Sequence, residues 1–195
     1  MNKLLGFYEL KAMNLPSIPW EEYTGYEHMD NTLLWTVRSA VYTGNDLNLP
    51  RVVGVTSEEA TKFALSLLRR IEKKGMVLFY PYFVAIKSGT INVFSDKIVI
   101  EAVKNDLWNL VTYSDREVTL IISDRHIQYD GNKDFLSVNE LSQLLKYIPE
   151  IKKNFRDELQ SGVSIMLEWS FAFNCDVNKV KKGSEYLVFY EVRTV

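Results

Sequence analysis

Charged side chains interrupt apolar runs that otherwise have the composition of buried β-strands. Arg38 lies in LWTVRSAV, Glu101 in KIVIEAV and Glu168 in IMLEWSF, and the chain ends with Glu191 and Arg193 in VFYEVRTV. A buried charge is unfavourable by several kcal/mol unless it is paired or bound to a ligand. Three carboxylates and two guanidinium groups on strands therefore predict a site for a cation and a polyphosphate.

The length and composition are those of a globular protein. A chain of 195 residues that is 47% hydrophobic can bury one core, so we expect a single domain over residues 1–195. A net charge of −2 gives no broad basic field, and nucleic acid is not an expected partner. No apolar run is long enough for a membrane span, and MNKLLGFYELKAMN lacks the apolar character of a signal peptide. We expect a cytoplasmic protein without a membrane partner, and the single Cys175 excludes an internal disulfide.

Residues 1–75 are expected to form a small N-terminal lobe. The segment through about residue 34 is turn-rich and shows little periodicity, and residues 42–54 gather Gly, Asn, Asp and Pro in a predicted loop. A helix is predicted from Ser57, because the apolar residues that follow lie on one helical face before Lys73-Lys74-Gly75 ends it.

Residues 76–195 are expected to form the main β-sheet lobe, which begins with an antiparallel meander. Strands are predicted at 77–86, 90–95 and 97–103. Lys87-Ser88-Gly89 is predicted to be the hairpin turn between the first two of these strands.

The remainder of this lobe is predicted to add two hairpins and further helices. One hairpin turns at Asp124-Arg125, and Ser137 with Glu140 has the spacing of a capping box that opens a helix. Two long strands, 163–173 and 184–193, close the chain. The predicted fold class is α+β, an antiparallel β-sheet with flanking helices.

The last hairpin carries the predicted chemistry. If its strands pair, Glu168 comes level with Glu191, and two neighbouring carboxylates repel unless a cation lies between them. Carboxylate oxygens that also face phosphates suit Mg²⁺, which makes these two glutamates the predicted metal ligands. Arg193 shares the strand face of Glu191, where it would contact phosphate or simply pair with the glutamates.

Five short motifs occur in the order found in the ATP-grasp nucleotide-binding domain of pyruvate phosphate dikinase and phosphoenolpyruvate synthase. GFYELKAMNLPSIPW resembles the opening of that domain, and WTVRSAVYTGNDL resembles its Val-Arg-Ser segment with a downstream Asp-Leu, here Asp46-Leu47. MVLFYPYFVAIKSGTINVF and KIVIEAVKNDLWNLV are similar to its next strands. LEWSF and YEVRTV resemble the Ile-Glu-Trp and Leu-Gln-Ala-Arg-Pro segments that close its ATP site. The resemblance implies a compact ATP-grasp-like fold with a reduced N-terminal lobe.

The same resemblance implies ATP and Mg²⁺ as cofactors. Arg38 and Arg193 would offset charge on the phosphates during transfer, and Glu168 would be a metal ligand, with Glu191 standing where the family has a glutamine. The residues that would line the nucleotide site are Arg38, Tyr80, Tyr82, Lys87, Glu101 and Arg193. An aromatic residue on a strand is more often part of a core, although one of these tyrosines could form the wall of an adenine pocket.

The chain departs from the family pattern at several positions. Gly6 falls about where the family has a nucleotide-binding lysine, which leaves Lys3 or Lys11 as nearby substitutes. Neither His28 nor His126 lies in a phosphohistidine motif, so the resemblance implies transfer in trans to a protein acceptor that carries this function.

Three hypotheses follow. The first is an ATP-dependent phosphotransferase, and the second is an ATP-grasp-like binding or scaffold module without catalysis. A structure with Arg193 held by both glutamates would favour the second. The third is a plain α+β domain whose five strand charges are satisfied structurally.

Overall fold

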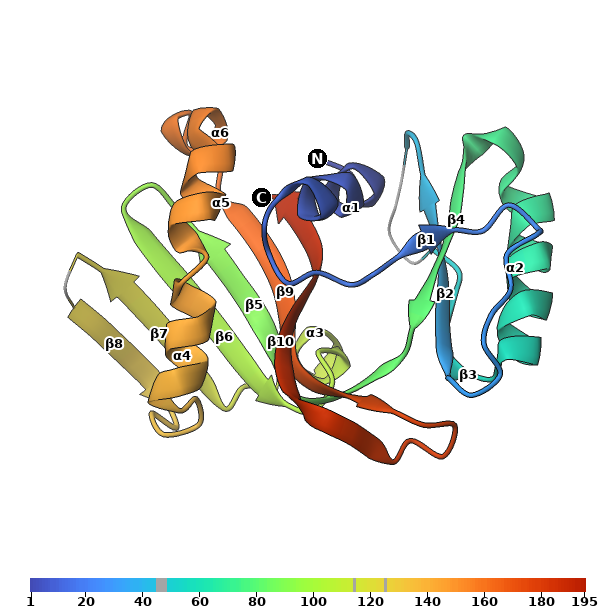
Figure 1. Ribbon diagram of the computed structural model, residues 1–195. Helices are drawn as coiled ribbons and strands as arrows, with labels where there is room; N and C mark the ends of the chain where they lie inside the picture. The colour runs from blue at the N-terminus through green and yellow to red at the C-terminus, as the bar shows by residue number, and fades with distance from the viewer. Residues whose placement is uncertain (45–48, 114, 125) are drawn as a thin grey trace.

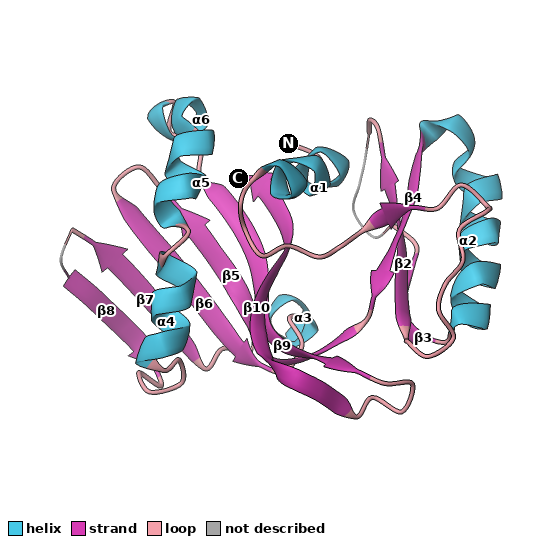
Figure 2. Ribbon diagram, in the orientation of Figure 1, coloured by secondary structure: helices cyan, strands magenta, loops and turns pink. Residues whose placement is uncertain are grey.

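The fold comprises two antiparallel sheets with flanking helices (Figures 1 and 2). It is a computed structural model that describes residues 1–44, 49–113, 115–124 and 126–195. The expected α+β class, with antiparallel sheets and flanking helices, is confirmed. None of the helices in the described ranges is both long and apolar enough to cross a membrane.

The smaller sheet has four strands, in the order β1 (Glu21–Glu22), β4 (Gly75–Pro81), β2 (Trp35–Val41) and β3 (Arg51–Val55). Helix α2 (Ser57–Ile71) packs on it, with Ala60, Ala64 and Leu67 fully buried. Thr56 and Glu59 exchange hydrogen bonds at the start of this helix, as in a capping box. The predicted helix from Ser57 is thus confirmed.

Strand β4 belongs to this smaller sheet, so the sheet extends to Pro81, beyond the expected boundary at residue 75. The predicted loop at 42–54 contains β3, while residues 45–48, including the Asp46-Leu47 motif, lie outside the described residues. Both differences arise because β2 pairs with β3 on one side and with β4 on the other, and this pairing is nonlocal.

Helix α1 (Lys3–Ala12) replaces the turn-rich segment expected at the N-terminus. The Asn2 side chain accepts a hydrogen bond from the backbone of Leu5 and caps the helix. Leu4, Phe7 and Leu10 recur every three residues and are buried. Gly6 in its middle conceals the helical pattern because glycine disfavours helix interiors.

The larger sheet has six strands and one face covered by helices. Its order is β10 (Lys181–Thr194), β9 (Ile165–Cys175), β5 (Phe83–Val93), β6 (Lys97–Lys104), β7 (Val118–Ser123) and β8 (His126–Gly131). Figure 1 shows α4 (Val138–Leu145), α5 (Ile148–Asn154) and α6 (Arg156–Gln160) in front of this sheet. Leu120, Leu144 and Ile151 belong to the core between the two layers.

Strand β5 runs without a turn through Lys87-Ser88-Gly89, so the predicted hairpin there is wrong. It pairs with β6 on one side and with β9 on the other, and Gly89 is opposite both Ala102 and Trp169. A Cβ at residue 89 would meet the backbone oxygen of Glu101 and lie 2.6 Å from the Trp169 ring. Glycine marks a close approach at this position and not a turn.

The other hairpins and the capping box are confirmed. β7 pairs with β8, with Asp124 between them and Arg125 outside the described residues. Ser137 and Glu140 form the capping box of α4. β9 and β10 pair with Glu168 directly opposite Glu191, as expected. A bulge precedes this pair on β10, between Phe189 and Glu191.

Candidate functional site

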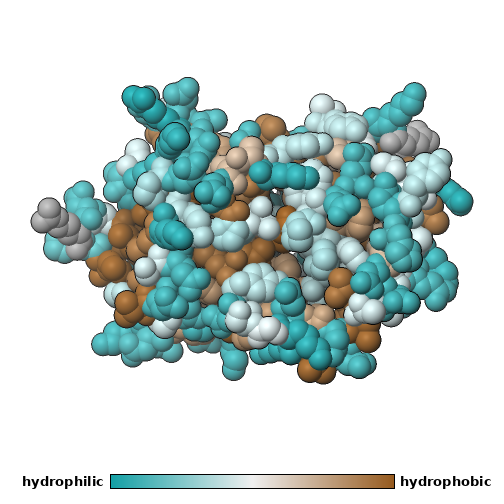
Figure 3. Space-filling model, viewed as in Figure 1, coloured by the Kyte–Doolittle hydropathy of each residue, from teal (hydrophilic) through white to brown (hydrophobic). Residues whose placement is uncertain are grey.

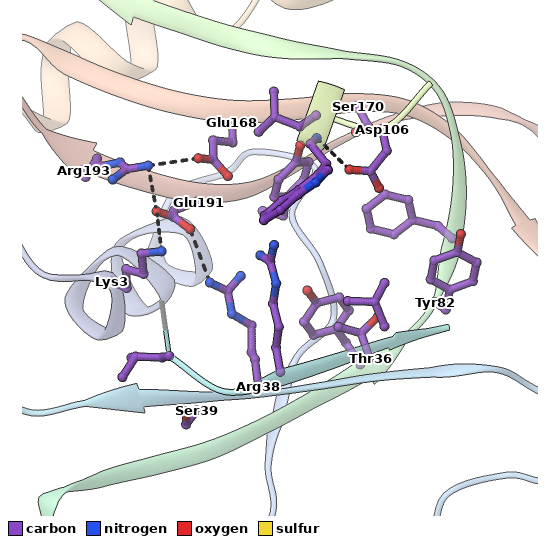
Figure 4. A pocket seen from close by; sticks show the side chains of 18 residues that line it. Lys3, Thr36, Arg38, Ser39, Tyr82, Asp106, Glu168, Ser170, Glu191 and Arg193 are labelled. Carbon is purple, nitrogen blue, oxygen red and sulfur yellow. Dashed lines mark hydrogen bonds and ion pairs between the residues drawn. The ribbon is translucent and has the colours of Figure 1, made fainter. Parts of the chain in front are cut away.

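A cleft of about 570 Å³ lies between the two sheets (Figure 4). Charged side chains enter it from three directions, namely from α1, from the smaller sheet and from the larger sheet. Its charged lining residues are Lys3, Arg38, Arg51, Asp106, Glu168, Glu191 and Arg193. Its aromatic lining residues are Tyr80, Tyr82, Phe83, Trp108 and Tyr190.

Arg38 enters the cleft from β2 and is only 8% exposed. Its Nη2 donates a hydrogen bond of 3.4 Å to Glu191 Oε2, which lies on the other sheet. The guanidinium also lies 4.9 Å from the centre of the Phe7 ring. This arginine therefore connects α1, the smaller sheet and the larger sheet at one point.

Arg193 contacts both glutamates of the last hairpin. Its Nη2 lies 3.0 Å from Glu168 Oε1 and 3.3 Å from Glu191 Oε1 (Figure 4). Lys3 Nζ lies 3.8 Å from the same Glu191 oxygen. Although two cations are near it, Glu191 Oε1 has no hydrogen bond to any described residue, and neither does the buried Arg193 Nε. Close charges with incomplete hydrogen bonding are the pattern of a site that a ligand could complete.

The carboxyl group of Glu168 is strongly perturbed. Burial is the main cause that raises its pKa to about 7, and the neighbouring Glu191 raises it further. Arg193, Arg38 and Lys3 act in the opposite direction. A cation bound at this position would stabilise the ionised form.

Arg51 and Trp108 face each other from the two sides of the cleft. Arg51 begins β3, and Trp108 begins the short helix α3 (Trp108–Tyr113). The guanidinium lies 5.2 Å from the indole centre. No ion pair joins Arg51 to a carboxylate among the residues that the structure describes. Asp106 accepts a hydrogen bond from the Trp108 backbone and so fixes the start of α3.

Arg51 and Trp108 were not among the predicted site residues. Arg51 follows Pro50 in a segment read as a loop, and only the pairing of β3 with β2 directs it to the cleft. An arginine directly before two valines, Val52 and Val53, was the signal available in the sequence. Tyr80 and Tyr82, which were predicted, do line the cleft. Burial raises the pKa of Tyr80, against the attraction of Arg38.

Lys87 and Glu101, also predicted site residues, are not in the cleft lining. Lys87 Nζ donates to Glu140 Oε2 and to the Phe135 carbonyl oxygen, each at 2.8 Å. Glu101 Oε1 lies 2.6 Å from Arg116 Nη1 at a partly exposed position. The structure thus brings Arg38, Glu168, Glu191 and Arg193 together, whereas Lys87 and Glu101 have other partners.

The two substitutes for the family lysine differ in position. Lys3 lines the cleft, whereas Lys11 Nζ lies 4.4 Å above the Trp20 ring and outside the lining. His28 and His126 are exposed and are not in the lining either. Lys3 is therefore the candidate for contact with phosphate.

The carboxylates of the cleft are few, but their number is compatible with Mg²⁺. Within the described ranges, no three His, Cys, Asp or Glu side chains gather as metal ligands. Glu168 and Glu191 supply two carboxylates, and Mg²⁺ commonly uses one or two together with phosphate and water. Two features fit such an ion. One Glu191 oxygen lacks a hydrogen bond among the described residues, and the pKa of Glu168 is raised, so that a bound cation would stabilise its ionised form.

No protein-family model matches the chain, and no curated protein matches it. Solved structures do match, among them the macrocyclase MdnC bound with precursor peptide MdnA from Microcystis aeruginosa MRC. The two chains are 14% identical with a TM-score of 0.47, over 97% of this chain and 51% of the macrocyclase. This chain therefore spans about half the length of that protein.

Proposed function

We propose that this chain is an ATP-grasp-like protein that binds Mg-ATP in the cleft between its two sheets. One observation carries the proposal. Lys3, Arg38, Arg51 and Arg193 converge from both sheets and α1 on a cavity of about 570 Å³ that also has aromatic walls. That volume lies within the usual range for small-molecule sites.

The cations lie in two parts of the cleft, from which they would contact different phosphate groups. Arg38 and Lys3 lie on the Glu191 side of the cleft, and Arg51 lies at Trp108. Guanidinium groups bind phosphate oxygens in a bidentate way, and an ammonium acts as a point charge. Tyr82, Phe83 and Trp108 line the cleft and would supply the aromatic surface for a base.

Glu168 and Glu191 would hold Mg²⁺. Bound there, the ion would neutralise phosphate charge and orient the terminal phosphate. The residues of the chain would position the nucleotide and exclude water, and Arg38 and Arg193 would stabilise the charge that develops during transfer. Lys3 would contact the phosphates as well. We propose that the terminal phosphoryl group of ATP is then transferred to a separate protein acceptor, with ADP as the leaving group.

The second candidate is a binding or scaffold module without catalysis. The contacts of Arg193 with both Glu168 and Glu191 favour it, because the guanidinium already compensates the two carboxylates. In a catalytic site Arg193 would have to shift from at least one of them for Mg²⁺ to enter. Nucleotide would then bind through Arg38 and Arg51 with little dependence on Mg²⁺.

Calorimetric titration with ATP and ADP, each with and without Mg²⁺, tests the proposal. We expect Mg²⁺-dependent binding of ATP that Glu168→Gln and Arg193→Ala weaken at least about tenfold, a loss of ~1.4 kcal/mol. Glu58→Gln is the matched control, because Glu58 is exposed on α2 and pairs with Lys62. Unchanged affinity and Mg²⁺ dependence in both cleft variants would refute the proposal. Binding without Mg²⁺ dependence, and without ADP production from ATP, would support the second candidate.

A further inference from the structure

The outer edge of the larger sheet is exposed along β8. All six residues from His126 to Gly131 are exposed, and among the described strands β8 pairs with β7 only, without a bulge. In an antiparallel pair, half of the backbone groups of an edge strand point away from its neighbour. The sequence HIQYDG contains neither lysine nor proline, the residues that commonly protect such an edge.

The opposite edge of the same sheet, β10, is covered in part. Residues 16–18 run beside β10, where Phe189 donates to the Pro16 oxygen and Ile18 donates to the Phe189 oxygen. The chain therefore satisfies the backbone of this edge internally at Phe189. No described segment does the same for β8.

The two faces of β8 differ in polarity. Tyr129 is opposite Leu120, and Ile127 is opposite Ile122, so both lie on the face that continues the helix-covered core. They nevertheless remain 41% and 42% exposed. Figure 3 shows hydrophobic residues gathered beside α4, over the β7–β8 hairpin.

The residues of β8 are complementary to their own antiparallel copy. Pairing about Gln128 places Ile127 opposite Tyr129, and both stay on the apolar face. It places His126 opposite Asp130 on the other face, where an imidazole N–H can donate to a carboxylate. A twofold axis repeats each of these pairs, as an isologous interface requires. Cross-strand pairs of these types each stabilise a sheet.

We propose that β8 pairs with β8 of a second copy of this chain, antiparallel about Gln128, to form a continuous sheet across a dimer. The interface covers one short strand from each copy and the adjacent apolar side chains. Such an area is below the roughly 1,200 Å² of many stable complexes, so the dimer dissociates readily on dilution. The cleft lies at the other end of the sheet order and stays accessible.

Sedimentation velocity over a concentration series tests the pairing. The wild-type chain is expected to shift from monomer to dimer as its concentration rises. Gln128→Lys and Gln128→Glu each place like charges opposite each other at the axis, so each variant alone is expected to remain monomeric. An equimolar mixture of the two places opposite charges there and is expected to dimerise again.

Tyr26→Lys is the control, because it adds the same charge at a side chain that is 94% exposed and away from β8. This variant is expected to dimerise as the wild type does. A wild-type chain that stays monomeric throughout overturns the proposal. A dimer that persists in both Gln128 variants, or a mixture that stays monomeric, overturns it equally.

Discussion

At the scale of single residues, the ionisation of Glu168 is the most unusual feature of the cleft. Burial and Glu191 raise its pKa from 4.5 to about 7. The folded chain therefore binds more protons than the unfolded chain between these two values. The contribution of Glu168 to stability accordingly falls as the pH rises through this window, and it is fully lost above the folded pKa.

Glu168→Gln is expected to remove this dependence. Near pH 8 the variant should be more stable than the wild type without ligand, by up to about 3 kcal/mol, whereas the two should differ little near pH 5. Urea unfolding followed by circular dichroism at both pH values measures the difference. The same gap between the two proteins at both pH values would contradict it.

Lys87 has a structural role at the level of a single ion pair, because its partner is Glu140 at the start of α4 and not a residue of the cleft. Lys87→Ala would leave Glu140 with its capping hydrogen bonds but without its ion pair, which should lower stability by about 2 kcal/mol. Nucleotide affinity should not change. Unfolding and calorimetry of the same preparation separate these effects. Lys104→Ala is a matched control, because Lys104 is the exposed neighbour of Lys87 on β6. If Lys87→Ala lost nucleotide affinity and Lys104→Ala did not, Lys87 would belong to the nucleotide site after all.

At the scale of elements, the contact between α1 and β10 positions Lys3. A Cβ on Gly6 would meet the backbone oxygen of Val192, so the helix can approach the strand this closely only with glycine there. Lys3 lies one turn before Gly6 and near Glu191. Gly6 therefore has a packing role in this fold.

Gly6→Ala is expected to displace α1 from β10. Stability should fall by about 2 kcal/mol, because the opposing group is backbone and cannot rotate away. ATP affinity should fall with it as Lys3 leaves the cleft. Leu5→Ala, at a residue that is 48% exposed on the same helix, should change neither property much. Thermal melts and titrations of both variants test this, and equal effects in the two would argue against the close approach.

Strand β5 shows why some elements were predicted and others were not. Local signals were sufficient for α2, for the capping box of α4 and for the last hairpin, where Glu168 and Glu191 came into register as expected. The pair Ser88-Gly89 has the composition of a turn. It lies mid-strand, where the Glu101 backbone oxygen of β6 leaves no space for a Cβ on one side and neither, on the other, does the ring of Trp169. That neighbour is 80 residues away in the sequence and leaves no local signal.

At the scale of the whole molecule, the cleft is formed by both sheets, so its ligand should stabilise both. Mg-ATP at about 100 times its dissociation constant should add about 2.7 kcal/mol to the free energy of unfolding. Amide hydrogen exchange should slow in β2 and β3 as well as in β9 and β10. Protection restricted to one sheet would contradict binding between them.

The sequence by itself determined the antiparallel α+β class, the β7–β8 and β9–β10 hairpins and the four charges Arg38, Glu168, Glu191 and Arg193. These follow from periodicity, turn chemistry and the unfavourable burial of charge, all of which act over a few residues. Only the tertiary structure decided which charges share a cleft. It brought Arg51 in and gave Lys87 and Glu101 other partners, because strand pairing across the two sheets joins residues that the sequence keeps far apart.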